Sequence, residues 1–217
     1  LVYPGELRGT KWFDEYKRQS YNLNLGLRQI INKKMVLAVF PGVSYQHGLL
    51  ATPFHRVYFK DNSVRVEKLP GNRFKIPLGL QLNSFIGNKY VLNSYYRFYW
   101  DNFGIAAHTL ELECNYKATP VLARAPFFRF YTQLAADFFK PYAEHDLSEE
   151  FYTSDYDLSS FDSYEVGMEL RLKSLGKKSR LIFEELAIRY SYYDRSDGLH
   201  AHTITLLSQV QYRKKQR

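Results

Sequence analysis

The stretch FKIPLGLQLNSFIGNKYVLNSYYRFYW, residues 74–100, alternates apolar and polar side chains on both sides of a short GNK turn. Successive side chains of a β-strand point to opposite faces of the sheet, so this pattern predicts a hairpin whose two strands share one apolar and one polar face. The fold then depends on which face meets water. A soluble β-protein buries the apolar face, whereas a membrane-spanning barrel turns it toward lipid.

The same alternation extends along most of the chain and predicts strands of about 10–15 residues. We predict them at residues 20–31, 35–48, 73–86, 89–101, 104–117, 120–134, 162–174, 179–194 and 199–213. Strands of soluble proteins average about 5–6 residues, whereas a tilted strand needs about 9–11 to cross a bilayer. The sequence contains no run of about 18 apolar residues, which a transmembrane helix would need.

The connections between these strands alternate in length. The short ones, NKK, GN, AT and LGKK, fall at every second junction, while the others include two long loops at about residues 49–72 and 135–161 and two tight turns, DNFG and RSDG. This sidedness is typical of outer-membrane barrels. Aromatic residues near strand ends fit the girdles at the two membrane interfaces. They are Tyr90, Trp100, Phe103, Tyr116, Tyr190, Tyr192 and Tyr212.

Composition and charge support the membrane interpretation. Aromatic residues make up 17% of the chain, with 19 Tyr and 16 Phe, more than a soluble core of this size needs. The net charge of +8 is polarised along the presumed barrel axis, because the short turns and the C-terminus are basic whereas residues 135–162 are acidic. A basic end of this kind explains the charge without a nucleic-acid partner. The single cysteine, Cys114, excludes an internal disulfide and falls on the apolar face.

On this interpretation the polar face lines the lumen and carries charges of both signs, often two residues apart. In a barrel of about ten strands, such side chains would fill the interior as a paired ionic network. We interpret its carboxylates as structural and not as a catalytic pair. The predicted lumen network comprises Arg28, Lys75, Arg97, Glu111, Glu113, Arg129, Glu165, Glu169, Arg171, Lys173, Glu185 and Arg189.

The number of predicted strands is odd, whereas closed single-chain barrels of bacterial type have an even number. We therefore expect at least one further strand before residue 20, either in LVYPGEL or upstream of Leu1. The predicted fold is an all-β, antiparallel, up-and-down transmembrane barrel of ten or more strands. Residues 1–217 form its single domain, which is N-terminally incomplete.

Two groups of residues offer metal ligands. His108, His200 and His202 lie near the tight outer turns, and AHT occurs at both 107–109 and 201–203. Interfacial histidines on adjoining strand ends are the commoner case, so no metal is predicted there. In the acidic loop, Asp155, Asp157 and Asp162 offer oxygen ligands for Ca²⁺. The alternative is that this loop pairs with the basic loop and forms a lid, using His55, Arg56, Lys60, Arg65 and Lys68.

Four long phrases carry a family resemblance: YQHGLLATPFHRVYF at 45–59, YYRFYWDNFGIAAHTLELE at 95–113, FFRFYTQLAADFF at 127–139 and FYTSDYDLSSFDS at 151–163. They resemble an uncharacterised family of Bacteroidota outer-membrane β-barrels, known only as a domain of unknown function. The resemblance spans most of the chain from residue 20 onward. It implies residence in the outer membrane of a Gram-negative bacterium and implies no activity.

The expected function is that of a non-enzymatic accessory or scaffolding subunit without a cofactor. Its partners would be outer-membrane lipid and the other outer-membrane or periplasmic proteins of a translocation, barrel-insertion or uptake machine. The short turns and the C-terminus would lie in the periplasm, and the long loops would be extracellular. The alternative is a narrow channel for small solutes. An envelope lipase or protease and a soluble nucleic-acid-binding β-domain remain the other classes to exclude.

Overall fold

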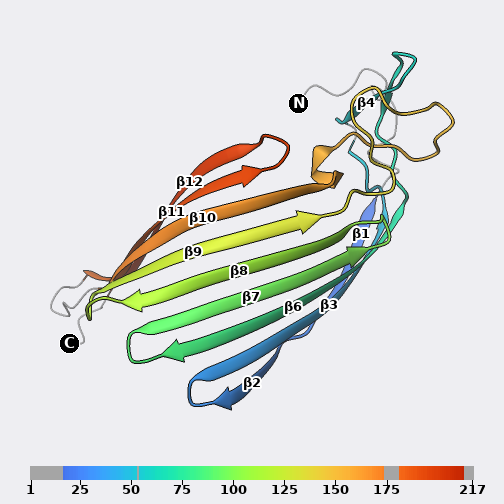
Figure 1. Ribbon diagram of the computed structural model, residues 1–217. Coiled ribbons are helices and arrows are strands. Elements are labelled where there is room, and N and C mark those ends of the chain that lie inside the picture. The colour runs from blue at the N-terminus through green and yellow to red at the C-terminus, as the bar shows by residue number, and fades with distance from the viewer. Residues whose placement is uncertain (1–16, 53, 174–180, 213–217) are drawn as a thin grey trace.

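The computed structural model describes residues 17–52, 54–173 and 181–212. These residues form long strands and one short 3₁₀ helix (Figure 1). The elements are β1 (Arg18–Asn24), β2 (Leu27–Asn32), β3 (Met35–Gly48), β4 (Arg56–Tyr58), β5 (Val64–Val66), β6 (Asn72–Ile86), β7 (Tyr90–Asp101), β8 (Ala106–Lys117), β9 (Leu122–Gln133), η2 (Tyr156–Leu158), β10 (Phe161–Lys173), β11 (Leu181–Arg195) and β12 (His200–Tyr212). Every strand predicted from the alternation is present.

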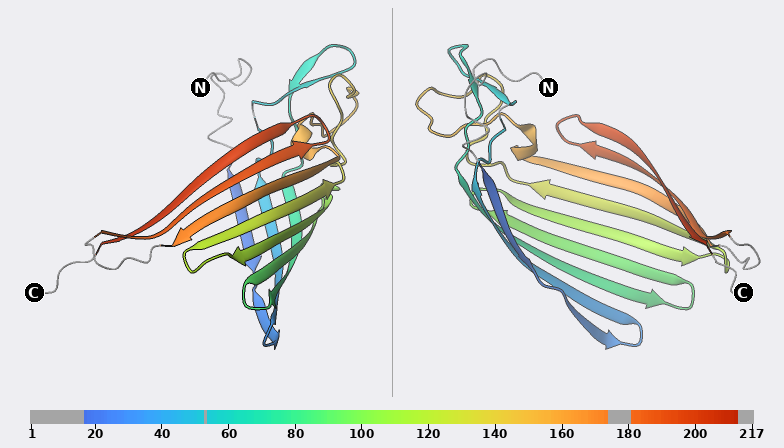
Figure 2. Two further views of the ribbon diagram at one scale, coloured as in Figure 1. Left: turned by 60° about the vertical axis from the view of Figure 1, so that its left-hand side comes forward. Right: turned by 180° about the vertical axis from the view of Figure 1, so that it is seen from behind.

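Ten of the strands form one antiparallel sheet in the order β1-β3-β6-β7-β8-β9-β10-β11-β12, with β2 also paired to β3. Figures 1 and 2 show this sheet, called the wall below, as a curved surface with a free edge on each side. Within the described residues β1 and β12 do not pair, so the sheet is not closed. The further strand predicted in LVYPGEL or upstream of Leu1 lies outside the described residues. Among the helices described, none is long and apolar enough to span a membrane.

The predicted strand 20–31 is a single edge strand with a break. β1 and β2 pair with the two halves of β3 in one register, since Asn24 faces Gly42 and Leu27 faces Val39 without an inserted residue. Pro41 lies opposite the break and has no N–H to donate to the ladder. Its carbonyl oxygen still accepts a hydrogen bond from the N–H of Leu25, at 3.0 Å. The proline therefore interrupts the ladder without shifting its register.

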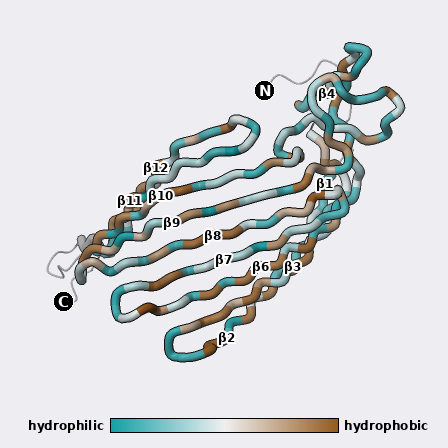
Figure 3. The backbone as a smooth tube through the Cα atoms, viewed as in Figure 1, coloured by the Kyte–Doolittle hydropathy of each residue, from teal (hydrophilic) through white to brown (hydrophobic). Residues whose placement is uncertain are grey.

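The apolar stripes point away from the curved interior of the wall. Figure 3 shows the alternation of apolar and polar residues along the strands. The even-numbered residues Phe74–Leu80 of β6 and Tyr164–Leu172 of β10 are between 36% and 49% exposed. The intervening residues of both strands face the other side of the sheet. In the middle of each strand their side chains are less exposed to solvent than those of the apolar stripe. The apolar face is thus a continuous outer belt and not a buried core.

The two long loops, residues 49–71 and 134–160, fold together into a second unit, called the loop lobe below. It lies at one end of the wall, and the short turns lie at the other (Figures 1 and 2). The hairpin β4–β5 and the helix η2 belong to it. Isolated bridges join the two loops, between Phe59 and His145 and between Lys68 and Tyr152. The predicted LGKK turn falls at residues 174–180, outside the described part of the chain.

The aromatic girdle predicted from the sequence needs one correction. Tyr90 and Tyr116 stack at the turn end, with ring centroids 4.8 Å apart. Phe103, in contrast, is almost fully buried in a small core with Ile105, Ala107 and Ala136. Phe103 belongs to the tight DNFG turn, which packs against the loop lobe. Its N–H donates a hydrogen bond to the carboxylate of Asp101, and its carbonyl oxygen accepts one from the N–H of Asp137 in the lobe. Phe103 is therefore a core residue and not an interfacial ring.

Candidate functional site

The predicted lumen residues share the inner face of the wall. One row of paired residues crosses six strands from β6 to β11 and comprises Gln81, Tyr95, Glu111, Arg129, Glu165 and Tyr193. Arg28 extends this row through Ala38. The other predicted members lie an even number of residues away along their strands, and side chains with that spacing point the same way. The structure therefore gathers the whole predicted set on one surface.

A chain of ion pairs connects part of this set across non-adjacent strands. Arg189 on β11 lies 3.3 Å from Glu113 on β8 and 3.6 Å from Glu169 on β10. Arg171 pairs with Glu169 at 2.5 Å and with Glu185 at 3.3 Å. Because β9 and β10 separate β8 from β11, the Arg189–Glu113 contact requires that their side chains lean together over the inside of the curve. The charged face is therefore the concave one.

Small residues alternate with these long side chains and give them room. Ala125 and Ala187 are buried beneath the charged groups. Gly167 leaves space for the ring of Phe127, which a Cβ atom there would meet at 2.6 Å. The guanidinium of Arg189 lies 3.7 Å from the centre of the same ring, within the range of a cation–π contact. The inner face is thus packed for long charged side chains.

Four predicted members take part neither in the ion-pair chain nor in the separate pair of Arg129 and Glu165. Lys75, Arg97, Glu111 and Arg28 have no ion pair within 4 Å among the residues that the structure describes. Arg97 lines a cavity of about 250 Å³ together with Arg73, Arg129, Tyr99 and Tyr131. Glu111 faces a second depression beside Glu113, Gln81 and Tyr95. The cavity beside Arg97 is therefore lined by three arginines and one carboxylate, Asp157, whereas the depression beside Glu111 is acidic.

A cluster at the lobe end of the wall was not predicted. Asp101 is fully buried, and its carboxylate accepts hydrogen bonds from Arg73 and Tyr99 and from the backbone N–H groups of Phe103 and Ile105. Arg73 also lies over the ring of Phe103, 4.7 Å from its centre. The sequence feature that could have indicated this cluster is Asp101 itself, which ends the strand predicted at 89–101 and begins the DNFG turn. Its role is to anchor that turn against β6.

The loop lobe contains an ionic cluster of its own around a buried histidine. The Nδ1 of His145 lies 2.6 Å from Glu149, and its Nε2 lies 2.9 Å from the carbonyl oxygen of Thr153. Partial burial opposes ionisation of Glu149, but the hydrogen bonds from Lys140 and His145 outweigh it and lower the pKa of Glu149 to about 2. Lys60 reaches from the other loop to Asp146, at 2.8 Å. The basic and acidic loops therefore pair with each other here. This pairing was expected from the sequence as the alternative to a Ca²⁺ site.

The structure does not bring together the three aspartates proposed as calcium ligands. Asp157 pairs with Arg195 of β11, at 2.7 Å. Asp162 is the second residue of β10, and its backbone forms hydrogen bonds with Ser196. Asp155 caps η2 and faces His55 and Glu67. His55, Glu67 and Asp155, the first two from the other loop, form a group in the described part of the lobe that could hold a metal ion.

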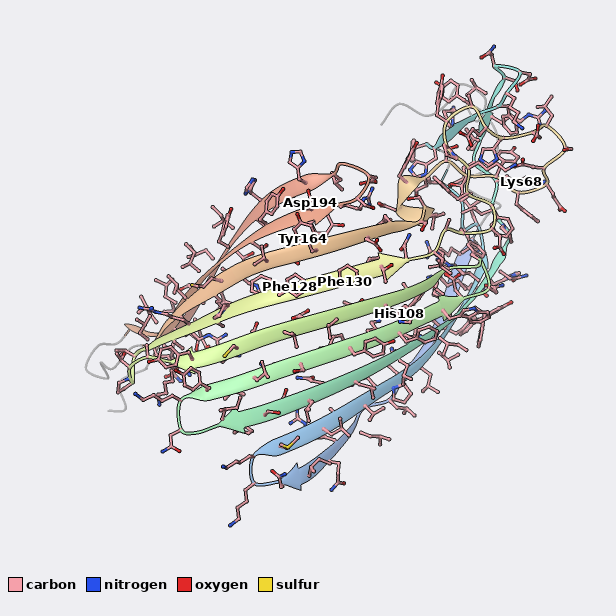
Figure 4. All side chains as sticks on the ribbon, in the orientation of Figure 1. Lys68, His108, Phe128, Phe130, Tyr164 and Asp194 are labelled. Atoms are coloured by element: carbon pink, nitrogen blue, oxygen red, sulfur yellow. The ribbon has the colours of Figure 1, made fainter. Side chains whose placement is uncertain are left out.

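The histidines of the two AHT repeats lie on the outer belt and make equivalent contacts. His108 is 2.7 Å from the hydroxyl of Tyr96, and His202 is 2.9 Å from that of Tyr190. His108 is labelled in Figure 4 with Phe128, Phe130 and Tyr164, which also belong to the outer belt. Three strands separate β8 from β12, so His108 does not join His200 and His202 in one site. Each repeat supplies a tyrosine–histidine pair to the aromatic girdle.

Solved structures give the fold an independent comparison. The wall is similar to OccK1 (OpdK) of Pseudomonas aeruginosa, an outer-membrane β-barrel protein, with 12% identity, a TM-score of 0.50 and coverage of 90% of this chain and 48% of that one. The same values hold for OpdK with vanillate. A bacterial polysaccharide outer-membrane secretin matches with 7% identity and a TM-score of 0.37, over 86% of this chain and 76% of its own.

The chain thus spans about half the length of OccK1, and the likeness concerns the fold. No curated protein matches the sequence. A family model described as "Protein of unknown function (DUF3570)" matches residues 3–211, nearly the whole chain. The protein therefore belongs to the DUF3570 family, and its antiparallel sheet resembles the wall of the OccK1 barrel.

Proposed function

We propose that the protein is a non-enzymatic outer-membrane β-barrel protein that serves as an accessory or scaffolding subunit of a larger envelope assembly. In this proposal the outer belt contacts lipid and the ionic network stabilises the lumen side of the wall. The loop lobe is extracellular and docks a protein of a translocation, barrel-insertion or uptake machine. The short turns, with Lys33, Lys34 and Lys89, face the periplasm.

The observation that carries the docking role is the combination of order and exposure in the loop lobe. Phe59 and Val57 are fully buried, and ion pairs join the two loops. The lobe nevertheless leaves large apolar side chains in solvent. Tyr58 of one loop contacts Tyr142 of the other, with ring centroids 4.8 Å apart, and Tyr142 is 65% exposed. Exposed aromatic residues on a pre-organised surface are characteristic of protein interfaces.

Site-specific photocrosslinking in the native envelope tests this role. A photoreactive residue at Tyr142 should trap a defined protein, whereas one at Asn88 in a short turn serves as the control for proximity at the other end of the wall. Tyr142→Ser with Leu147→Ser should release a larger complex to the size of the free protein in mild detergent. A protein that extracts as a monomer and forms no crosslink from Tyr142 contradicts the proposal. Lipase and protease assays of the purified protein should show no turnover.

A narrow channel for small solutes is the second candidate. The observation that favours it is the cavity on the inner face beside Arg97, a cation with no ion-pair partner among the described residues. A pore that passes this surface should prefer anions. Conductance in planar bilayers distinguishes the two functions, because the scaffolding role predicts little or none. A channel predicts steady conductance whose anion preference falls in Arg97→Glu.

A further inference from the structure

Three side chains with metal-ligating atoms meet where the two loops of the lobe join. His55 precedes β4, Glu67 follows β5, and Asp155 precedes η2 in the other loop. One donor atom of each lies within 4.8 Å of the others. The Nδ1 atom of His55 is 3.7 Å from Glu67 and 3.8 Å from Asp155. Within the described part of the chain, this is the one group of three such residues that could hold an ion.

Glu67 gives the group a fixed and buried carboxylate. Its side chain is only 3% exposed. One oxygen accepts a hydrogen bond from the backbone N–H of Thr52 at 3.0 Å, and the other accepts one from the hydroxyl of Thr153 at 2.5 Å. Both donors are neutral, so they orient the carboxylate without balancing its charge. A buried carboxylate is costly unless a cation lies beside it, and Asp155 adds a second negative charge at the same place.

The opposite side of the group is open. A cavity of about 270 Å³ lies against it, lined by Phe54, His55, Arg56, Ser154, Asp155 and Tyr156. The imidazole of His55 is 48% exposed. An ion can therefore enter from solvent and retain positions for water, while Glu67 holds it from the buried side.

From this geometry we propose that the loop lobe binds one divalent transition-metal ion through His55, Glu67 and Asp155. One imidazole and two carboxylates suit Zn²⁺ or Mn²⁺, whose bonds of about 2.0–2.2 Å would draw the three donors slightly closer together. Ca²⁺ prefers six to eight oxygen ligands and is disfavoured. The ion would cross-link the two loops. This inference does not depend on the proposed docking role.

The competing interpretation is that protonated His55 alone bridges both carboxylates. Metal binding to the purified protein separates the two. The full chain is prepared in mild detergent without a polyhistidine tag, stripped with EDTA and titrated calorimetrically with ZnCl₂, MnCl₂ and CaCl₂. The proposal predicts one Zn²⁺ per chain, with Ca²⁺ binding at least tenfold weaker.

Variants locate the site. His55→Gln and Asp155→Asn should each weaken Zn²⁺ binding at least tenfold. Both are mild changes, since His55 is half exposed and asparagine also caps helices. Asp146→Asn removes a carboxylate of the same lobe outside the group and should change the affinity less than twofold. Zn²⁺ should also slow proteolysis of the lobe in the unaltered protein but not in His55→Gln.

Two results would overturn the proposal. The first is that the unaltered protein binds neither Zn²⁺ nor Mn²⁺, which would leave the ion pair of His55 as the whole explanation. The second is that His55→Gln retains the affinity of the unaltered protein, which would place bound metal elsewhere. If Asp155→Asn does not fold, His55→Gln and its protease pattern decide the question.

Discussion

In the loop lobe, Phe59 is fully buried beside Val57 and Tyr152, whereas in the wall Phe74 is exposed on the outer belt. The charged residues show the reverse arrangement. In the wall Arg189 and Glu169 meet on the concave face, while in the lobe Lys60 and Asp146 pair at the surface. The difference agrees with the proposed placement, in which the loop lobe lies in water and the outer belt of the wall contacts lipid.

The largest expected effect comes from truncating the same residue type in both regions. Phe59→Ala should destabilise the loop lobe by about 3–5 kcal/mol, because it leaves a cavity in a small core. Phe74→Ala should cost less than about 2 kcal/mol, because the side chain is only partly covered by protein. Hydrogen exchange of lobe and wall peptides measures both. Equal losses of stability in the two variants would show that Phe74 is a core residue like Phe59. That result would contradict the difference between lobe and wall.

The next effect is a charge placed on either face of one strand. Leu80→Arg puts a cation on the outer belt near the middle of β6 and should destabilise the inserted protein by about 2–4 kcal/mol. Gln81→Arg is the matched control, since it places the same cation on the inner face near Glu111 and Glu113. Urea unfolding in bilayers gives both values. A harmless Leu80→Arg together with a costly Gln81→Arg would reverse the assignment of the faces.

A smaller effect tests the inner ion network. Arg189→Met leaves Glu113 and Glu169 without this partner, and should cost about 1–2 kcal/mol, less than for a fully buried pair because the site is partly exposed. Arg129→Met breaks a 3.9 Å pair of a half-exposed arginine and should cost at most about 1 kcal/mol. Unfolding midpoints rank the two. A costlier loss from Arg129→Met would show that the network is not centred on Arg189.

The last effect is confined to acid pH. Because the pKa of Glu149 falls from 4.5 to about 2 on folding, the ionised carboxylate stabilises the loop lobe fully above about pH 4.5. This stabilisation is lost as the pH falls from 4.5 toward 2. Hydrogen exchange of residues 140–153, corrected for its intrinsic pH dependence, should show the loss. In Glu149→Gln the decline should be reduced, and an unchanged decline would assign it to other groups.

The strands of the wall could be predicted because each has two faces in different surroundings. Apolar and polar residues therefore alternate along its sequence. The nine predicted segments and the membership of the inner face both follow from that pattern. The break in the first strand lies opposite Pro41, and its position depends on the pairing of β1 and β2 with β3, which is not visible in the edge strand alone. The short hairpin β4–β5 lacks the length that made the other strands recognisable.

The loop lobe was harder to predict, because its contacts join residues far apart in the chain. The general pairing of a basic and an acidic loop could be expected from charge. The particular partners could not: Asp157 pairs with Arg195, and Asp155 meets Glu67. Three nearby aspartates therefore suggested a calcium site that the fold separates. His145 gave no signal of burial, since only the folded lobe encloses it.

Nitroxide scanning of β10 is the most direct test of the two faces of the wall. Single cysteines from Tyr164 to Lys173, in a Cys114→Ser background reconstituted in bilayers, report access to oxygen dissolved in lipid and to a water-soluble nickel complex. The account predicts a period of two, with lipid contact at Tyr164, Val166, Met168, Leu170 and Leu172. Water access at those positions, with lipid contact at Glu165, Glu169 and Arg171, would contradict it.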